Sequence, residues 1–186
     1  CGYGLSRYQF KGKAFLLSFL LVTQMFPAVM KIIPYYKILV SVHLNNTQIG
    51  LMVVYASFSI PFCTWMMYGY FKSISTGLDE AARVDGSSAF NTFLKIILPI
   101  ALPGLVATII YAFLQNWNEY MFASVLMSAD EKKTITYAIS TMADAYKIQW
   151  NYLMCAAMIS SVPTLTVFVV MQKYLIAGMT AGAVKE

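Results

Sequence analysis

Long apolar runs separated by short polar stretches dominate this sequence. Charged residues are absent from positions 14–30, 38–71, 96–118 and 148–172. A helix that crosses a bilayer needs about 20 predominantly apolar residues, so each run can hold one span. The polar stretch from Asn45 to Gln48 interrupts the longest run and leaves room for a single helix after it. We therefore predict spanning helices at about 14–33, 49–71, 102–126 and 150–176.

Composition agrees with a membrane protein. Of the 186 residues, 59% are hydrophobic and 11% are charged, whereas soluble domains are about 25% charged. The net charge is +5, but the basic residues are scattered at the ends of apolar runs and form no stripe of the kind that binds nucleic acid. We expect an all-α membrane protein in contact with lipid, with about four transmembrane helices in this chain and no nucleic-acid partner.

The main polar interruption is the loop 76–99. Its first part carries Asp79, Glu80, Arg83 and Asp85, and each such charge at a bilayer centre costs about 2.5–3.5 kcal/mol. This part must therefore lie outside the membrane. Thr76 and Asp79 have the spacing of a capping box, and Gly86 suits the left-handed position that follows a helix. The pattern predicts a short polar helix between Thr76 and Gly86.

A second short helix is expected to start at Ser87 or Ser88 and to end near Leu98, because Pro99 cannot donate a hydrogen bond to the preceding turn. Apolar residues at helical spacing predict one stripe on this helix, which should lie against the membrane face of the bundle. The stripe consists of Phe90, Phe93, Leu94 and Ile97.

Seven positions of this loop resemble the EAA loop of the membrane-spanning permease subunits of bacterial ABC importers. They are Glu80, Ala81, Ala82, Gly86, Ile96, Leu98 and Pro99. The resemblance implies a cytoplasmic coupling helix that docks into a cleft on a separate ATPase subunit. The residues it assigns to this contact are Glu80, Ala81, Ala82, Arg83, Asp85 and Gly86.

The sequence contains no phosphate-binding loop of the form G-x-x-x-x-G-K-[ST] and no nucleophile elbow. We therefore expect that the chain is not an enzyme and binds no cofactor. The resemblance implies that ATP and Mg are used by the partner ATPase.

The N-terminal stretch 1–13 is similar to a pattern that follows an earlier span in the same family, A-Y-x-L-x-R-F-x-F-x-G-K. The matching residues are Tyr3, Leu5, Arg7, Tyr8, Phe10, Gly12 and Lys13. The resemblance implies that 1–186 is a permease domain lacking roughly the first third of a six-span subunit. Four spans would place residues 1–13, the coupling loop 76–99 and the tail 178–186 on one side of the membrane, and the excess of basic residues there favours the cytoplasmic side.

Two more stretches resemble the second permease subunit of maltose-type sugar importers: Q-M-F-P-A-V at 24–29 and G-M-T-A-G-A-V-K at 178–185. In that group the tail reaches the interface of the two ATPase subunits, which implies contacts from Thr180, Gly182 and Lys185. The resemblance implies import of a mono- or oligosaccharide across the bacterial cytoplasmic membrane. The implied partners are a second permease subunit, two ATPase subunits and an extracytoplasmic solute-binding protein.

A polar and aromatic run near the end of the third predicted span is a candidate for the substrate pathway. It consists of Asn116, Trp117, Asn118, Glu119 and Tyr120, and it resembles a W-N-E-[FY] run of sugar permeases. These groups could stack on a sugar and hydrogen-bond to it; alternatively, Glu119 could cap a helix end in the headgroup region. Asn116, Gln115 and Gln24 could equally hydrogen-bond to neighbouring helices.

Three other functions are compatible with parts of this pattern. An ATP-independent secondary transporter would carry ionisable residues at midspan, which the charge-free runs lack. A non-transporting scaffold would use the polar loop only for docking. An importer of amino acids or peptides would share the EAA loop, because that loop does not specify the substrate.

Overall fold

The structure is a computed structural model that describes residues 1–143 and 149–183, with 174–183 described only as helical backbone. Eleven α-helices and two short helical segments of other type follow one another in these residues. They are α1 (Gly2–Arg7), α2 (Lys13–Met25), α3 (Ala28–Ser41), α4 (Gln48–Ser73), α5 (Gly77–Val84), α6 (Ala89–Thr92), the π-helical segment η1 (Phe93–Ile97), α7 (Leu98–Ile100), α8 (Leu102–Trp117), α9 (Met121–Leu126), the 3-10 segment η2 (Asp130–Lys132), α10 (Ile135–Thr141) and α11 (Trp150–Ala183).

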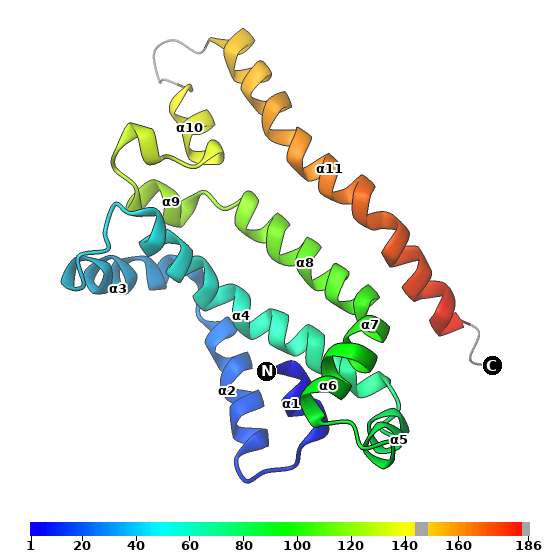
Figure 1. Ribbon diagram of the computed structural model, residues 1–186. Coiled ribbons are helices and arrows are strands. Elements are labelled where there is room, and N and C mark those ends of the chain that lie inside the picture. Colours follow the sequence, from blue (N-terminus) through cyan, green and yellow to red (C-terminus); the bar gives the residue numbers. More distant parts are fainter. Residues whose placement is uncertain (144–148, 184–186) are drawn as a thin grey trace.

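Two of the described helices, α4 and the Trp150–Lys173 part of α11, are long and apolar enough to cross a membrane. The number rises to four if each of two bent helix pairs counts as one span. The prediction of an all-α membrane protein with about four spans is confirmed. Figure 1 shows the N-terminus, α5 and the C-terminal end of α11 towards one end of the molecule, with α9 and α10 at the other.

The first predicted span, 14–33, is wrong as a single helix. The chain breaks at Pro27, which becomes the N-cap of α3, and α2 and α3 meet at an angle of 100°. Proline lacks the N–H and clashes with the preceding turn. The predicted span is therefore fully interrupted at Pro27.

The third predicted span also differs in its limits. The second half of the loop, Ala89–Ile100, bends by 77° at Ala101 into α8. Pro103 lies in the first turn of α8, where its missing N–H costs no intrahelical hydrogen bond. The span was expected to continue to 126, but α8 ends at Trp117 and α9 starts separately at Met121. In contrast, the second predicted span corresponds closely to α4, and α11 extends past its predicted end to Ala183.

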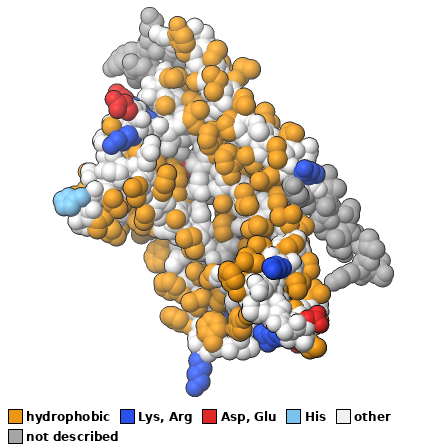
Figure 2. All heavy atoms as spheres, viewed as in Figure 1, with side chains coloured by type: hydrophobic (Ala, Val, Ile, Leu, Met, Phe, Trp, Pro, Cys, Tyr) orange, Lys and Arg blue, Asp and Glu red, His pale blue; other side chains and the backbone are white. Residues whose placement is uncertain are grey.

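Two small cores lie apart from each other. One joins α3, α4 and α9 through Leu39, Val54, Phe122 and their neighbours, and the other joins α4 to η1 and α7 around Phe71, Ile97 and Ala101. Elsewhere large apolar side chains are exposed. No residue in the most apolar stretch of Trp150–Lys173 in α11 is buried. The face in Figure 2 is accordingly dominated by hydrophobic side chains. An apolar surface of this extent suits lipid or partner helices.

Candidate coupling and substrate sites

Helix α5 has one face turned into the protein and one turned away from it. Asp79 and Ala82 are buried, whereas Glu80, Ala81, Arg83 and Asp85 are exposed. Val84 is 87% exposed although it is apolar. The helix starts after Thr76 as predicted, but the Thr76 side chain makes no capping hydrogen bond. The capping-box interpretation of Thr76 and Asp79 is therefore wrong.

Asp79 instead binds two residues of α1, more than 70 positions earlier in the chain. Nε of Arg7 lies 2.8 Å from Oδ2 of Asp79, and the hydroxyl of Tyr3 donates to Oδ1. Burial, and then the hydrogen bond to Asp79, raises the pKa of Tyr3 to about 12, so the phenol remains a donor at neutral pH. We call these three residues the α1–α5 clamp.

The clamp is nearly shielded from solvent, since the side chains of Arg7 and Asp79 are 6% and 10% exposed. The distance between Nε and Oδ2 is that of an ion pair, but the N–H does not meet the alignment of a hydrogen bond, and Nη2 of Arg7 has no partner among the described residues. The attraction is therefore Coulombic more than directional. It holds α5 to α1, and α1 packs against α4.

The joint between α5 and α6 follows the sequence prediction. Gly86 has φ +77°, the left-handed value that favours glycine, and the side chain of Ser88 caps α6 by accepting from the N–H of Asn91. This joint lets the chain turn sharply from the polar helix into the segment that leads to α8.

The apolar stripe predicted after this joint is only partly correct. Ile97 is fully buried, but Phe90 is 70% exposed and Leu94 is 41% exposed. Thr92, which is not part of the predicted stripe, is buried, and its hydroxyl donates to the carbonyl of Ser88. The π-helical turns of η1 change the angular spacing along this segment, so positions that align in an α-helix separate here.

The tail residues predicted to contact the ATPase cannot be placed as side chains. Thr180 and Gly182 belong to the last turns of α11, and their side chains lie outside the described residues. Lys185 lies outside the described residues altogether. Their role in ATPase contact stays a prediction.

Two residues of the predicted substrate run hold neighbouring helices. The amide of Asn116 donates to the hydroxyl of Ser59 on α4, as expected for hydrogen bonding between helices, and the indole of Trp117 donates to the carbonyl of Ser160 on α11. Asn118 is exposed and donates to the carbonyl of Leu114. These contacts stabilise the packing of α4, α8 and α11.

Glu119 caps α9. Its Oε1 accepts from the N–H of Phe122 at 2.8 Å, and its Oε2 accepts from the N–H of Ala123 and from the hydroxyl of Tyr55. The contacts of Glu119 are therefore those of a helix cap, the alternative to sugar binding that the sequence left open. Tyr120, the last residue of the run, is exposed and stacks edge-on against Tyr137.

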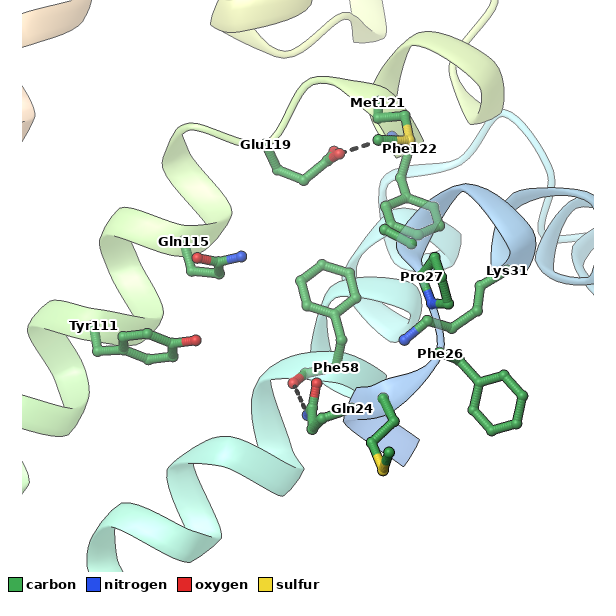
Figure 3. A pocket seen from close by; sticks show the side chains of 12 residues that line it. Gln24, Phe26, Pro27, Lys31, Phe58, Tyr111, Gln115, Glu119, Met121 and Phe122 are labelled. Carbon is green, nitrogen blue, oxygen red and sulfur yellow. Dashed lines mark hydrogen bonds between the residues drawn. The ribbon is translucent and has the colours of Figure 1, made fainter. Parts of the chain in front are cut away.

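A cavity of about 420 Å³ lies where the two helix breaks face α4. The break between α2 and α3 contributes Gln24, Met25, Phe26, Pro27, Ala28 and Lys31; α4 contributes Phe58; α8 and the start of α9 contribute Tyr111, Gln115, Glu119, Met121 and Phe122. Figure 3 shows these side chains around the opening, with Gln24 donating to the carbonyl of Phe58. The sequence singled out Gln24, Gln115 and Glu119, but it gave no signal that they share a cavity with Lys31.

Comparison with known proteins identifies the family. Residues 1–181 match the family described as binding-protein-dependent transport system inner membrane component. The chain belongs to this family. As its members are membrane components of transport systems, the chain is a membrane subunit and not an ATP-hydrolysing enzyme, as we expected from the lack of a phosphate-binding motif in its sequence.

Individual relatives carry similar names. The chain is 38% identical over 183 residues to the probable ABC transporter permease protein YurM of Bacillus subtilis, covering 98% of this chain and 61% of that protein. It is 33% identical to the trehalose/maltose transport system permease protein MalG of Thermococcus litoralis, covering 98% of this chain and 66% of that protein. It thus spans about two thirds of the length of these relatives.

A solved structure has the same fold. The crystal structure of a bacterial ABC transporter involved in the import of the acidic polysaccharide alginate contains a chain with a TM-score of 0.77 and 26% identity. The match covers 93% of this chain and 65% of that one. The arrangement of helices is therefore that of an ABC importer permease.

Proposed function

We propose that this chain is part of a permease subunit that imports a mono- or oligosaccharide at the expense of ATP hydrolysed by a separate ATPase. It would act in the bacterial cytoplasmic membrane with a second permease subunit, two ATPase subunits and an extracytoplasmic binding protein. ATP and Mg would bind to the ATPase subunits. The observation that carries the coupling part of this proposal is the two-faced helix α5.

The outer face of α5 suits a protein partner. Glu80, Arg83 and Asp85 offer charges for pairing, and Val84 offers an apolar contact that water would otherwise surround. Ala81 is small and exposed, which permits close approach of a partner. Ala82 is buried against this chain and so serves the attachment of α5 rather than the contact with the ATPase.

Motion of α5 can reach the membrane by two routes. The first is the α1–α5 clamp, which leads through α1 to α4. The second runs from Gly86 through α6, η1 and α7 to α8, with Ile97 and Ala101 packed against Phe71 of α4. Because both routes end on spanning helices, a displacement of α5 would tilt α4 and α8 together.

The sugar part of the proposal is supported by the relatives. One is named for trehalose and maltose, another is the diacetylchitobiose uptake permease of Streptomyces coelicolor, and the structural relative imports alginate. The substrates in all three names are carbohydrates. The cavity supplies amide, ammonium and phenol groups beside aromatic rings, which is the chemistry that binds sugar hydroxyls and sugar faces.

Charge reversal on α5 tests the coupling. The variant Glu80→Arg should lose most co-purification of the ATPase subunits while its insertion into the membrane is unchanged. The matched control is Glu131→Arg, the same substitution at an exposed residue of η2, between α9 and α10. If both variants retain the ATPase equally, α5 is not the docking helix.

A further inference from the structure

The cavity of about 420 Å³ is bordered by two interrupted helices, α2–α3 at Pro27 and α8–α9 at Glu119. Irregular backbone at membrane depth is tolerated where it lines a cavity, and interrupted helices frame the substrate sites of many transporters. The position of the cavity thus marks it as a candidate binding site. Its two charged residues decide what it can bind.

The negative charge in this cavity is already engaged. Both carboxylate oxygens of Glu119 accept hydrogen bonds, from Phe122, Ala123 and Tyr55. The two backbone N–H groups belong to the first turn of α9, whose partial positive charge favours a carboxylate there. Glu119 is therefore fixed as a structural cap and presents little free acceptor capacity to a ligand.

The ammonium of Lys31, which is the positive charge in this cavity, has fewer hydrogen bonds than Glu119. The ammonium of Lys31 donates to the carbonyl of Thr23 at 3.4 Å, and within the described ranges it forms no ion pair with a carboxylate. It lies in the first turn of α3, whose N-cap Pro27 provides no side-chain acceptor. A half-buried ammonium that has only one long hydrogen bond retains donors for an incoming anion.

Neutral polar side chains from other elements border the same cavity as Lys31. In Figure 3, Tyr111 and Gln115 of α8 extend towards the opening from the side opposite Lys31. Gln24 donates its amide N–H to the carbonyl of Phe58, which leaves its own side-chain oxygen as an acceptor. Together these side chains offer both donors and acceptors to hydroxyl groups, beside the ring of Phe58.

We propose that this cavity is a subsite for a sugar that carries a carboxylate, with Lys31 pairing with the carboxylate and Gln24, Tyr111 and Gln115 binding hydroxyls. The proposal rests on the proposed function and narrows it to acidic saccharides. A uronate is ionised at neutral pH, and a charge-assisted hydrogen bond to an ammonium is about twice as strong as a neutral one.

The test is binding of trigalacturonate and of the neutral maltotriose to the intact importer complex in lipid nanodiscs, measured by titration calorimetry. Lys31→Met should weaken trigalacturonate binding about tenfold or more and leave maltotriose binding unchanged, because a hydrogen bond to a charged group is among the strongest available. Lys31→Arg should retain most of the affinity. Lys37→Met, an exposed lysine of the same helix, should bind like the wild type.

Three results would overturn the subsite: equal binding of both sugars with no effect of Lys31→Met, equal weakening of both sugars by Lys31→Met, or no binding of either sugar. Uptake by proteoliposomes with the cognate binding protein separates these from failure of the proposed function. If one of these three results is found, ATP-dependent uptake of a neutral sugar would keep the importer assignment, and only the acidic subsite would be lost. Absence of ATP-dependent sugar uptake of any kind would remove the assignment itself.

Discussion

Substituting Asp79 by Asn tests whether the α1–α5 clamp holds the coupling helix in place. Asparagine has nearly the same shape and keeps an acceptor for the hydroxyl of Tyr3, but it removes the charge that faces Arg7. The change leaves a guanidinium that is 6% exposed without a compensating anion. We therefore predict that α5 detaches from α1 in this variant, while the rest of the α5 sequence is unchanged.

The size of the effect follows from the burial of the pair. Removing one partner of a buried ion pair costs about 3–5 kcal/mol. The lower end applies here, because Nε of Arg7 is not aligned as a hydrogen-bond donor and Nη2 already lacks a partner in the described part of the chain. About 3 kcal/mol corresponds to roughly a hundredfold increase in the population of the state in which α5 is detached.

Hydrogen exchange read by mass spectrometry measures this population directly. Peptides that cover Gly77–Val84 should exchange about a hundredfold faster in Asp79→Asn, while peptides of α8 change little. Asp85→Asn removes an exposed carboxylate from the same loop and should leave exchange within about fivefold of the wild type, because exposed charges contribute about 0–1 kcal/mol. Equal exchange in the two variants would refute the clamp. So would an additive effect of Arg7→Met and Asp79→Asn, because interacting residues couple by about 0.5–3 kcal/mol in a double-mutant cycle.

Two glycine substitutions give further predictions, both read as the thermal unfolding midpoint in detergent. Gly86→Ala should destabilise the loop by about 1–2 kcal/mol, since an L-residue is strained at φ +77°. The control Gly77→Ala, at the first residue of α5, should be neutral or slightly stabilising. Equal midpoints for these two variants would contradict the left-handed joint. Gly104→Ala places a Cβ 2.3 Å from the ring of Tyr70 and should cost about 1–3 kcal/mol by overpacking α4 against α8. Gly69→Ala meets no atom within 4 Å, so a Gly104 variant as stable as the Gly69 variant would be inconsistent with this packing.

The apolar runs and the polar stretches between them were enough to predict the helical class, the position of α4 and the polar loop. Gly86 and Ser88 were also predictable, because a positive φ and a helix N-cap have local residue preferences. These features depend on residues within a few positions of one another. For the same reason, the exposed face of α5 could be expected from its charges.

Features that depend on distant contacts were not predictable. Asp79 fits a capping box by spacing, and only the folded chain brings Arg7 and Tyr3 to it. The run ending at Glu119 is apolar enough to continue a span, but the carboxylate caps a new helix and ends α8. Pro27 lies inside an apolar run that predicted a single span, but the folded chain breaks there and packs α3 and α9 against α4.

The cavity shows the same limit. Gln24 and Gln115 lie about ninety positions apart, and no local pattern indicates that they border one opening with Lys31. The polar residues could be named from the sequence, but the place where they meet depends on where two helices are interrupted.

The most direct test of the central claim is sugar uptake into proteoliposomes that contain the complete importer and its loaded binding protein. With ATP available to the ATPase subunits, the wild type should accumulate sugar, and a non-hydrolysable ATP analogue should abolish accumulation. Glu80→Arg should also abolish it, whereas Glu131→Arg should transport like the wild type. Uptake at the same rate with and without ATP hydrolysis would contradict the assignment of this chain to an ATP-driven sugar importer coupled through α5.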